Sequence, residues 1–139
     1  MALHPALLDE LLDLELGHAR RHLGDRAGDL RREGHHLLMT LTKGDRSWNL
    51  RLDGSRYDAE PYDVALVDDD GNILAAPDWI QDGFLHGIHS SLGIPWTCVS
   101  GTRAYYAHES HYKQRWDQDR ANTHADTLLA KLLTKAGIG

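Results

Sequence analysis

The sequence predicts one α+β domain over residues 1–139, with an N-terminal helix, an antiparallel β-meander, a long irregular segment and a C-terminal helix. Three observations carry this prediction. Leucines recur at helical spacing near both ends of the chain. Apolar residues alternate with polar ones between positions 36 and 67, and glycines and prolines interrupt every pattern between positions 73 and 101. A chain of 139 residues also has the usual length of one compact domain.

The first helix is expected from Pro5 to about Leu23. Proline is favoured in the first turn of a helix, and the apolar residues that follow return every three or four positions, as one buried face requires. Four acidic residues are expected in the early turns, where the positive end of the helix dipole favours them. These four are Asp9, Glu10, Asp13 and Glu15. A polar, glycine-containing connection is expected over residues 24–34.

The meander is expected to contain three strands, over residues 36–42, 48–52 and 62–67. In the first of them Leu37, Met39 and Leu41 alternate with other residues and so share one face. A turn at residues 43–46 joins it to the second strand, and the aspartate-rich stretch at 68–72 ends the third. The sequence therefore predicts a short antiparallel sheet after the first helix.

The segment from residue 73 to residue 101 is expected to be irregular and to be packed on the domain through its aromatic side chains. An irregular stretch of this length is uncommon in a compact domain and is often functional. A second amphipathic helix is expected from about Asp117 to Ala136, where alanines and leucines recur at helical spacing before Gly137.

Composition excludes several classes of protein. The net charge of −6 and the absence of a lysine or arginine cluster argue against a nucleic-acid partner. No apolar run approaches the ~18 residues of a membrane span, and the first residues lack the features of a signal peptide. A single cysteine permits no internal disulfide and suits a reducing, cytoplasmic environment.

The single cysteine, Cys98, is the first candidate for chemistry. It lies in a loop-like stretch between Gly93 and Gly101 and beside Trp96. A loop can expose a thiol, whose thiolate form is a nucleophile. The alternative is a small buried apolar side chain, which is the usual environment of a free cysteine.

Histidines supply a second candidate, a metal site. His108 and His111 are three residues apart and share one face if the segment is helical. Together with Cys98 they offer three zinc ligands, and a fourth could come from Glu109 or from another histidine. Because paired cysteines are absent and histidine is abundant throughout the chain, two solvated histidines remain the alternative. The other histidines that could supply the fourth ligand are His86, His89 and His124.

His89 and Ser91 are a third candidate. They precede the cysteine closely enough to donate hydrogen bonds to a developing oxyanion. The alternative is that they satisfy backbone groups in an irregular segment.

Two stretches resemble the ubiquitin-conjugating enzyme fold and its non-catalytic RWD relatives. The segment from Tyr57 through Pro61 to Val64 is similar to the tyrosine–proline segment that precedes a strand in that family. The segment from His89 to Val99, His-Ser-Ser-Leu-Gly-Ile-Pro-Trp-Thr-Cys-Val, is similar to the His-Pro-Asn stretch that runs to the catalytic cysteine. The order of predicted elements also matches, although serines stand where the family has proline and asparagine.

The resemblance implies a carrier enzyme that needs no cofactor. Cys98 would receive the C-terminal acyl group of a ubiquitin-like protein from an activating enzyme, hold it as a thioester and transfer it to an amine. The catalytic residues would be Cys98, His89 and Ser91. The family's oxyanion asparagine is replaced by serine, so His89, Ser91 or a backbone N–H would have to supply the hydrogen bond.

Two alternatives follow from the same resemblance. The region from Cys98 to His111 is similar to bacterial proteins encoded with ubiquitin-like proteins, one group of which is described as metal-binding with a Cys-Glu-His-His set. In that case Cys98, His108, Glu109 and His111 would bind zinc. The other alternative is a non-catalytic, RWD-like interaction module in which the cysteine is buried.

Overall fold

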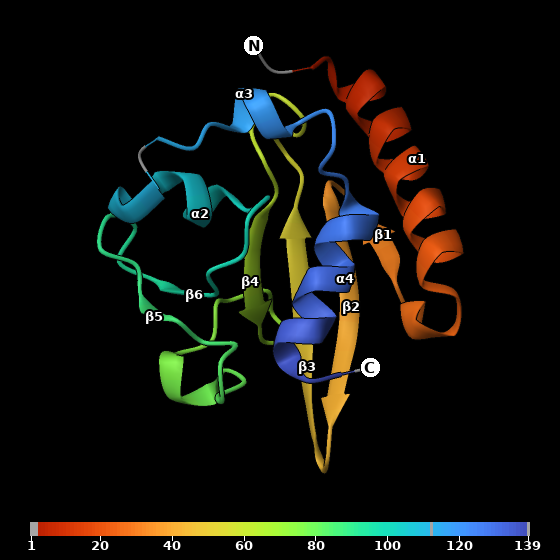
Figure 1. The fold of residues 1–139 in the computed structure, drawn as a ribbon. Coiled ribbons are helices and arrows are strands. Elements are labelled where there is room, and N and C mark those ends of the chain that lie inside the picture. Colours follow the sequence, from red (N-terminus) through yellow and green to blue (C-terminus); the bar gives the residue numbers. More distant parts are fainter. Residues whose placement is uncertain (1–2, 112, 139) are drawn as a thin grey trace.

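The computed structural model describes residues 3–111 and 113–138. It is an α+β fold in which a four-stranded antiparallel sheet is followed by an irregular region and short helices (Figure 1). The sheet has the strand order β1-β2-β3-β4. Its strands are β1 (Arg31–Glu33), β2 (His36–Lys43), β3 (Arg46–Asp53) and β4 (Asp63–Val67). The α-helices are α1 (Pro5–Leu23), α2 (Arg103–Ala107), α3 (Trp116–Asp119) and α4 (Ala125–Ala136).

Helix α1 has the bounds that its leucine spacing predicts. The His4 side chain accepts a hydrogen bond from the Ala6 N–H at its start, and Gly24 follows its last residue. Its buried face packs beside α4 on one face of the sheet (Figure 1). The acidic residues depart from the prediction, because none of them lies in the first turn of α1 and Glu15 is only 5% exposed and points into the protein.

The glutamate joins the two helices to the stretch before β4. Its Oε1 atom accepts hydrogen bonds from the Tyr62 hydroxyl at 3.2 Å and from the Ala125 N–H at 3.0 Å. Its Oε2 atom lies 3.1 Å from Nδ1 of His124, the residue that precedes α4. Burial, followed by the nearby carboxylate, raises the pKa of the Tyr62 phenol well above its usual range. A single carboxylate therefore fixes how α4 begins.

The two central strands pair in the register that their alternation predicts. Leu37, Met39 and Leu41 of β2 lie opposite Leu52, Leu50 and Trp48 of β3. All six side chains are buried on the face toward the helices, and together with residues of α1 and α4 they form the hydrophobic core. The other face of β2 and β3 carries polar and half-buried residues.

Two local predictions were wrong. Residues 31–33, expected in a polar connection, form the edge strand β1 and pair with β2. The expected helix from 117 to 136 is two helices, because the chain turns between α3 and α4. No element was predicted over residues 103–107, where the structure has the short helix α2 with the side chain of Thr102 as its N-cap.

The irregular region after β4 is packed as expected. Trp79 and Phe84 are fully buried, and Trp79 donates its indole N–H to the Leu74 carbonyl. Farther along, β5 (Gly87–Ile88) and β6 (Pro95–Trp96) form a small two-stranded sheet. Figure 1 shows this small sheet beside α2, to the left of the main sheet.

Candidate functional site

The cysteine lies two residues after β6, on a stretch held by buried neighbours on both sides. Trp96 and Thr97 before it are each 2% exposed, and Val99 after it is 6% exposed. Cys98 itself is partly exposed and has no disulfide partner. Cys98 is therefore a partly accessible residue between neighbours that are buried in the interior.

His111 lies beside the thiol. The Sγ of Cys98 is 3.5 Å from the Nε2 of His111, a separation within hydrogen-bond reach for sulfur. Helix α2 and the short turn at Glu109–His111 bring the chain back to this position. The imidazole is stacked on the Tyr105 ring, with ring centroids 3.8 Å apart and planes 20° apart. The ring is thus held in place by an aromatic contact while its nitrogen faces sulfur.

The surroundings of His111 favour its neutral form. Burial, and then the nearby imidazoles of His108 and His86, lower the pKa of His111 from its ordinary value. A neutral imidazole has one unprotonated nitrogen, which accepts a proton. At neutral pH this side chain can therefore act as a base toward the thiol.

His108 has different partners although it is only three residues away. Its ring is stacked on Trp96, with centroids 4.9 Å apart and planes 23° apart. Its Nδ1 accepts a hydrogen bond from the Ser110 N–H at 3.2 Å and also lies 2.7 Å from the Ser110 hydroxyl. Contact with the Trp96 ring and with Ser110 therefore fixes the orientation of His108.

The expected zinc ligands do not converge in this structure. Cys98 and His111 are close, but the available lone pair of His108 is bound locally, and Glu109 is exposed. Over residues 3–111 and 113–138 no group of three or more histidine, cysteine, aspartate or glutamate side chains is placed to share one ion. The arrangement supplies two ligands of a zinc site, and a structural site requires four.

His89 organises the loop before the cysteine. It is 1% exposed, its Nε2 lies 2.9 Å from the Ala104 carbonyl, and its Nδ1 accepts the N–H groups of Ser91 and Leu92. Because a carbonyl can only accept, the ring proton is on Nε2. Both nitrogens are therefore engaged with the backbone, so His89 positions the loop and has no donor left for an oxyanion. The Ser91 side chain is exposed.

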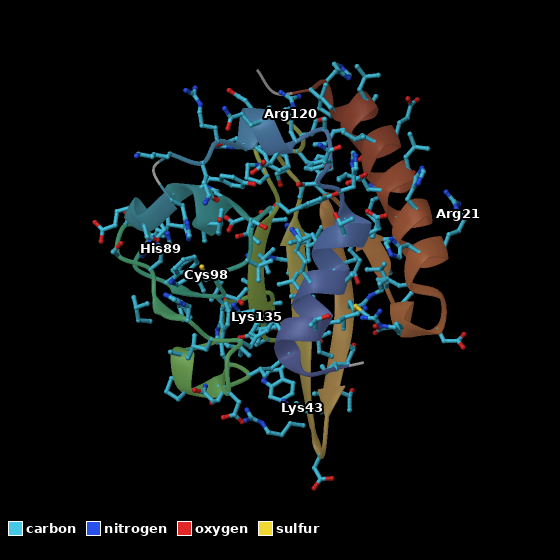
Figure 2. All side chains as sticks on the ribbon, in the orientation of Figure 1. Arg21, Lys43, His89, Cys98, Arg120 and Lys135 are labelled. Carbon is cyan, nitrogen blue, oxygen red and sulfur yellow. The ribbon has the colours of Figure 1, made fainter. Side chains whose placement is uncertain are left out.

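Helix α4 supplies two anchors that were not predicted from the sequence. Lys135 donates a hydrogen bond of 3.1 Å from Nζ to the Cys98 carbonyl, and Lys131 donates one of 2.9 Å to the Ser100 hydroxyl. Figure 2 labels Lys135 on α4, with Cys98 and His89 beyond it on the irregular region. The spacing of the two lysines, four residues apart on one helix face, is the only sequence signal for them.

Comparisons with known proteins add no family to this geometry. No protein-family model matches the chain, and no curated protein sequence matches it significantly. Among the helices that the structure describes, none has the length and apolar character to cross a membrane.

Proposed function

We propose that this protein is a ubiquitin-conjugating-enzyme-like carrier that accepts the C-terminal acyl group of a ubiquitin-like protein on Cys98. The donor would be an activating enzyme that carries the same group on its own cysteine. The observation that carries the proposal is the pair formed by the thiol of the partly exposed Cys98 and an imidazole 3.5 Å away whose lowered pKa favours its neutral form. The resemblance of residues 57–64 and 89–99 to that family supports it.

The first step is thioester exchange. A free cysteine is only a few per cent thiolate at neutral pH, so a base within reach of the thiol accelerates its attack. Nε2 of His111 takes the proton, and the sulfur attacks the carbonyl carbon of the incoming thioester. A carbon–sulfur bond to Cys98 forms, the bond to the donor's sulfur breaks, and the departing thiolate takes a proton.

The second step passes the acyl group to an amine. The amine nitrogen attacks the thioester carbon, an amide forms, and the Cys98 thiol is released. Each attack places negative charge on the carbonyl oxygen, which needs a hydrogen-bond donor. The resemblance puts that donor at position 91, and the Ser91 hydroxyl is the group available there because its N–H is bound to His89.

The proposed chemistry also indicates the cellular compartment. A carrier thiol must stay reduced, and the cytoplasm provides that condition. The partners would be the ubiquitin-like protein and its activating enzyme, with no metal or organic cofactor.

Zinc binding remains a second candidate because one distance favours it. A sulfur 2.3 Å and a nitrogen about 2.0 Å from one tetrahedral ion lie roughly 3.5 Å from each other, and Cys98 and His111 have this separation. A third ligand would require His108 to leave Ser110. Zinc held by Cys98 would occupy the sulfur, so the two functions exclude each other.

The test uses a synthetic peptide that ends in Gly-Gly as an α-thioester. We expect intact-mass spectrometry to show one peptide added to the folded protein and released by excess thiol, with no addition to Cys98→Ala. Zinc content is measured on the same preparation. One equivalent of zinc together with no peptide addition would establish the metal site instead. Addition only after unfolding would indicate a non-catalytic module.

A further inference from the structure

The outer face of α1 carries exposed leucines that no other part of the described chain covers. Leu7 is 54% exposed and Leu14 is 61% exposed, and Leu3, just before the helix, is 37% exposed. These values are high for large apolar side chains in a protein whose other leucines are mostly buried. Along this face the residues are separated alternately by four and by three positions. This is the spacing of the residues along which two helices pack against each other, and the set is called the seam here. The seam positions are Leu3, Leu7, Glu10, Leu14, Gly17 and Arg21.

Two opposite charges on this seam have no partner among residues 3–111 and 113–138. The neighbouring carboxylates of α1 are already engaged, since Asp9 and Asp13 both bind Arg32. Glu10 and Arg21 are exposed and unpaired within the described chain. Figure 2 shows Arg21 extending from α1 on the side away from α4. They lie eleven positions apart, or about three helical turns, so they cannot reach each other on one helix.

We infer that this face binds the same face of a second copy, with the two α1 helices antiparallel. A twofold axis midway between Leu14 and Gly17 places Glu10 of each copy opposite Arg21 of the other. The same register places each Leu14 opposite the other copy's Gly17. A seam that is acidic at one end and basic at the other is complementary to itself only in this antiparallel arrangement.

Gly17 has no side chain and therefore leaves space for Leu14 of the second copy. Only the tip of the Arg21 side chain lies within 4 Å of the position that a side chain at Gly17 would occupy. That guanidinium is exposed and leaves Gly17 when it turns toward the second copy's Glu10. Leu7 then lies over Gly24 of the second copy, where that helix ends. One pair of short helices is a small interface, so the dimer is expected to be weak and to need high protein concentration.

The test is sedimentation velocity at increasing concentration of the full chain. We expect the wild type to dimerise, and we expect Glu10→Arg or Arg21→Glu to weaken the dimer by about tenfold or more. The twofold axis repeats every contact, so each substitution acts twice. The double variant Glu10→Arg/Arg21→Glu restores both pairs and is expected to return the affinity to within about threefold of the wild type.

Two further variants complete the design. Leu14→Glu should abolish the dimer, and circular dichroism should show that this exposed substitution leaves the fold intact. Asp45→Lys is the matched control, because it reverses an exposed charge in the turn between β2 and β3 and should leave the affinity unchanged. A wild type that stays monomeric up to about millimolar concentration would overturn the inference. So would a double variant that binds no better than either single one.

Discussion

The Nζ atom of Lys135 lies 3.1 Å from the backbone carbonyl of Cys98, and this hydrogen bond ties the last turns of α4 to the segment that carries the thiol. Lys135 is partly buried, so its removal leaves that carbonyl without its donor. The position of the segment that carries the thiol therefore depends in part on α4.

Lys135→Met should lower the free energy of unfolding by about 1 kcal/mol, because a part-buried carbonyl loses its hydrogen bond. Urea titration measures this value. Lys131→Met is the matched control, since Lys131 is exposed and binds the hydroxyl of Ser100 at 2.9 Å and the Ser100 carbonyl at 3.4 Å rather than the cysteine backbone. Its effect should be clearly smaller, and equal losses in the two variants would contradict an anchoring role specific to Lys135. Lys135→Arg should recover part of the loss.

His111→Gln should slow acylation of Cys98 by the Gly-Gly peptide thioester by about 100-fold, the lower range for loss of a general base. His108→Gln is the control, because His108 contacts Trp96 and Ser110 instead of the thiol. We expect that variant to change the rate by only a few-fold. Equal losses in both variants would instead favour a shared metal.

The pH dependence of the same reaction follows from the direction of the pKa shift. Because the pKa of His111 is lowered, the imidazole stays neutral below the ordinary histidine value of about 6.5. The acceleration that neutral His111 gives to the wild-type rate should therefore still be present at pH 6.5. It should be lost only as the pH falls further. The ratio of wild-type to His111→Gln rates, measured from pH 8 down to pH 5, reports this loss. A ratio that has already fallen by half above pH 6.5 would contradict the lowered pKa of His111.

Thr97→Val should raise the free energy of unfolding by about 0.5–1 kcal/mol. The Thr97 hydroxyl is buried and has no hydrogen-bond partner among the described residues, so an apolar replacement of the same shape removes a desolvation cost. Thr102→Val is the contrast. Its equally buried hydroxyl donates to the Val99 carbonyl at 2.8 Å and accepts the Tyr105 N–H. That variant should lose about 1–2 kcal/mol. Thermal or urea unfolding compares the two variants. A loss of stability in Thr97→Val would contradict the claim that the buried Thr97 hydroxyl lacks a hydrogen-bond partner.

Glu15→Ala should be among the most destabilising substitutions in the chain, with a loss of about 3 kcal/mol. It leaves the Tyr62 hydroxyl and the Ala125 N–H without an acceptor in the interior. Glu15→Gln keeps one acceptor oxygen and should lose less. Asp13→Ala, which removes an exposed ion pair with Arg32, should cost less than about 1 kcal/mol. Comparable losses for positions 13 and 15 in urea titrations would show that the buried carboxylate does not hold α4.

The parts of the fold that follow from hydrophobic periodicity were predictable. Helix α1 begins at Pro5 and ends before Gly24, and β2 and β3 pair along their alternating residues. Strand β1 was not predictable, because its residues are all charged and its pairing with β2 comes from tertiary contacts. One of these contacts is the Arg32 guanidinium bound to Asp9 and Asp13 of α1. The break between α3 and α4 was also not predictable. The start of α4 is fixed by a hydrogen bond to Glu15, which lies more than a hundred residues earlier in the sequence.

The site was predictable only in part. Sequence spacing singled out Cys98 and His111 but grouped His111 with His108 as metal ligands, because spacing cannot show which ring nitrogen faces which atom. The two rings separate in the fold since one stacks on Trp96 and the other on Tyr105. His89 was recognised, but the roles of its nitrogens depend on backbone groups of Ser91, Leu92 and Ala104.

The most direct measurement of the central claim is the rate constant for acylation of Cys98 by the Gly-Gly peptide thioester, in the folded protein and in the same protein unfolded in urea. A site that presents the thiol beside a base should react at least about tenfold faster when folded, and His111→Gln should remove that advantage. A folded protein that reacts no faster than the unfolded chain would contradict the proposed carrier function.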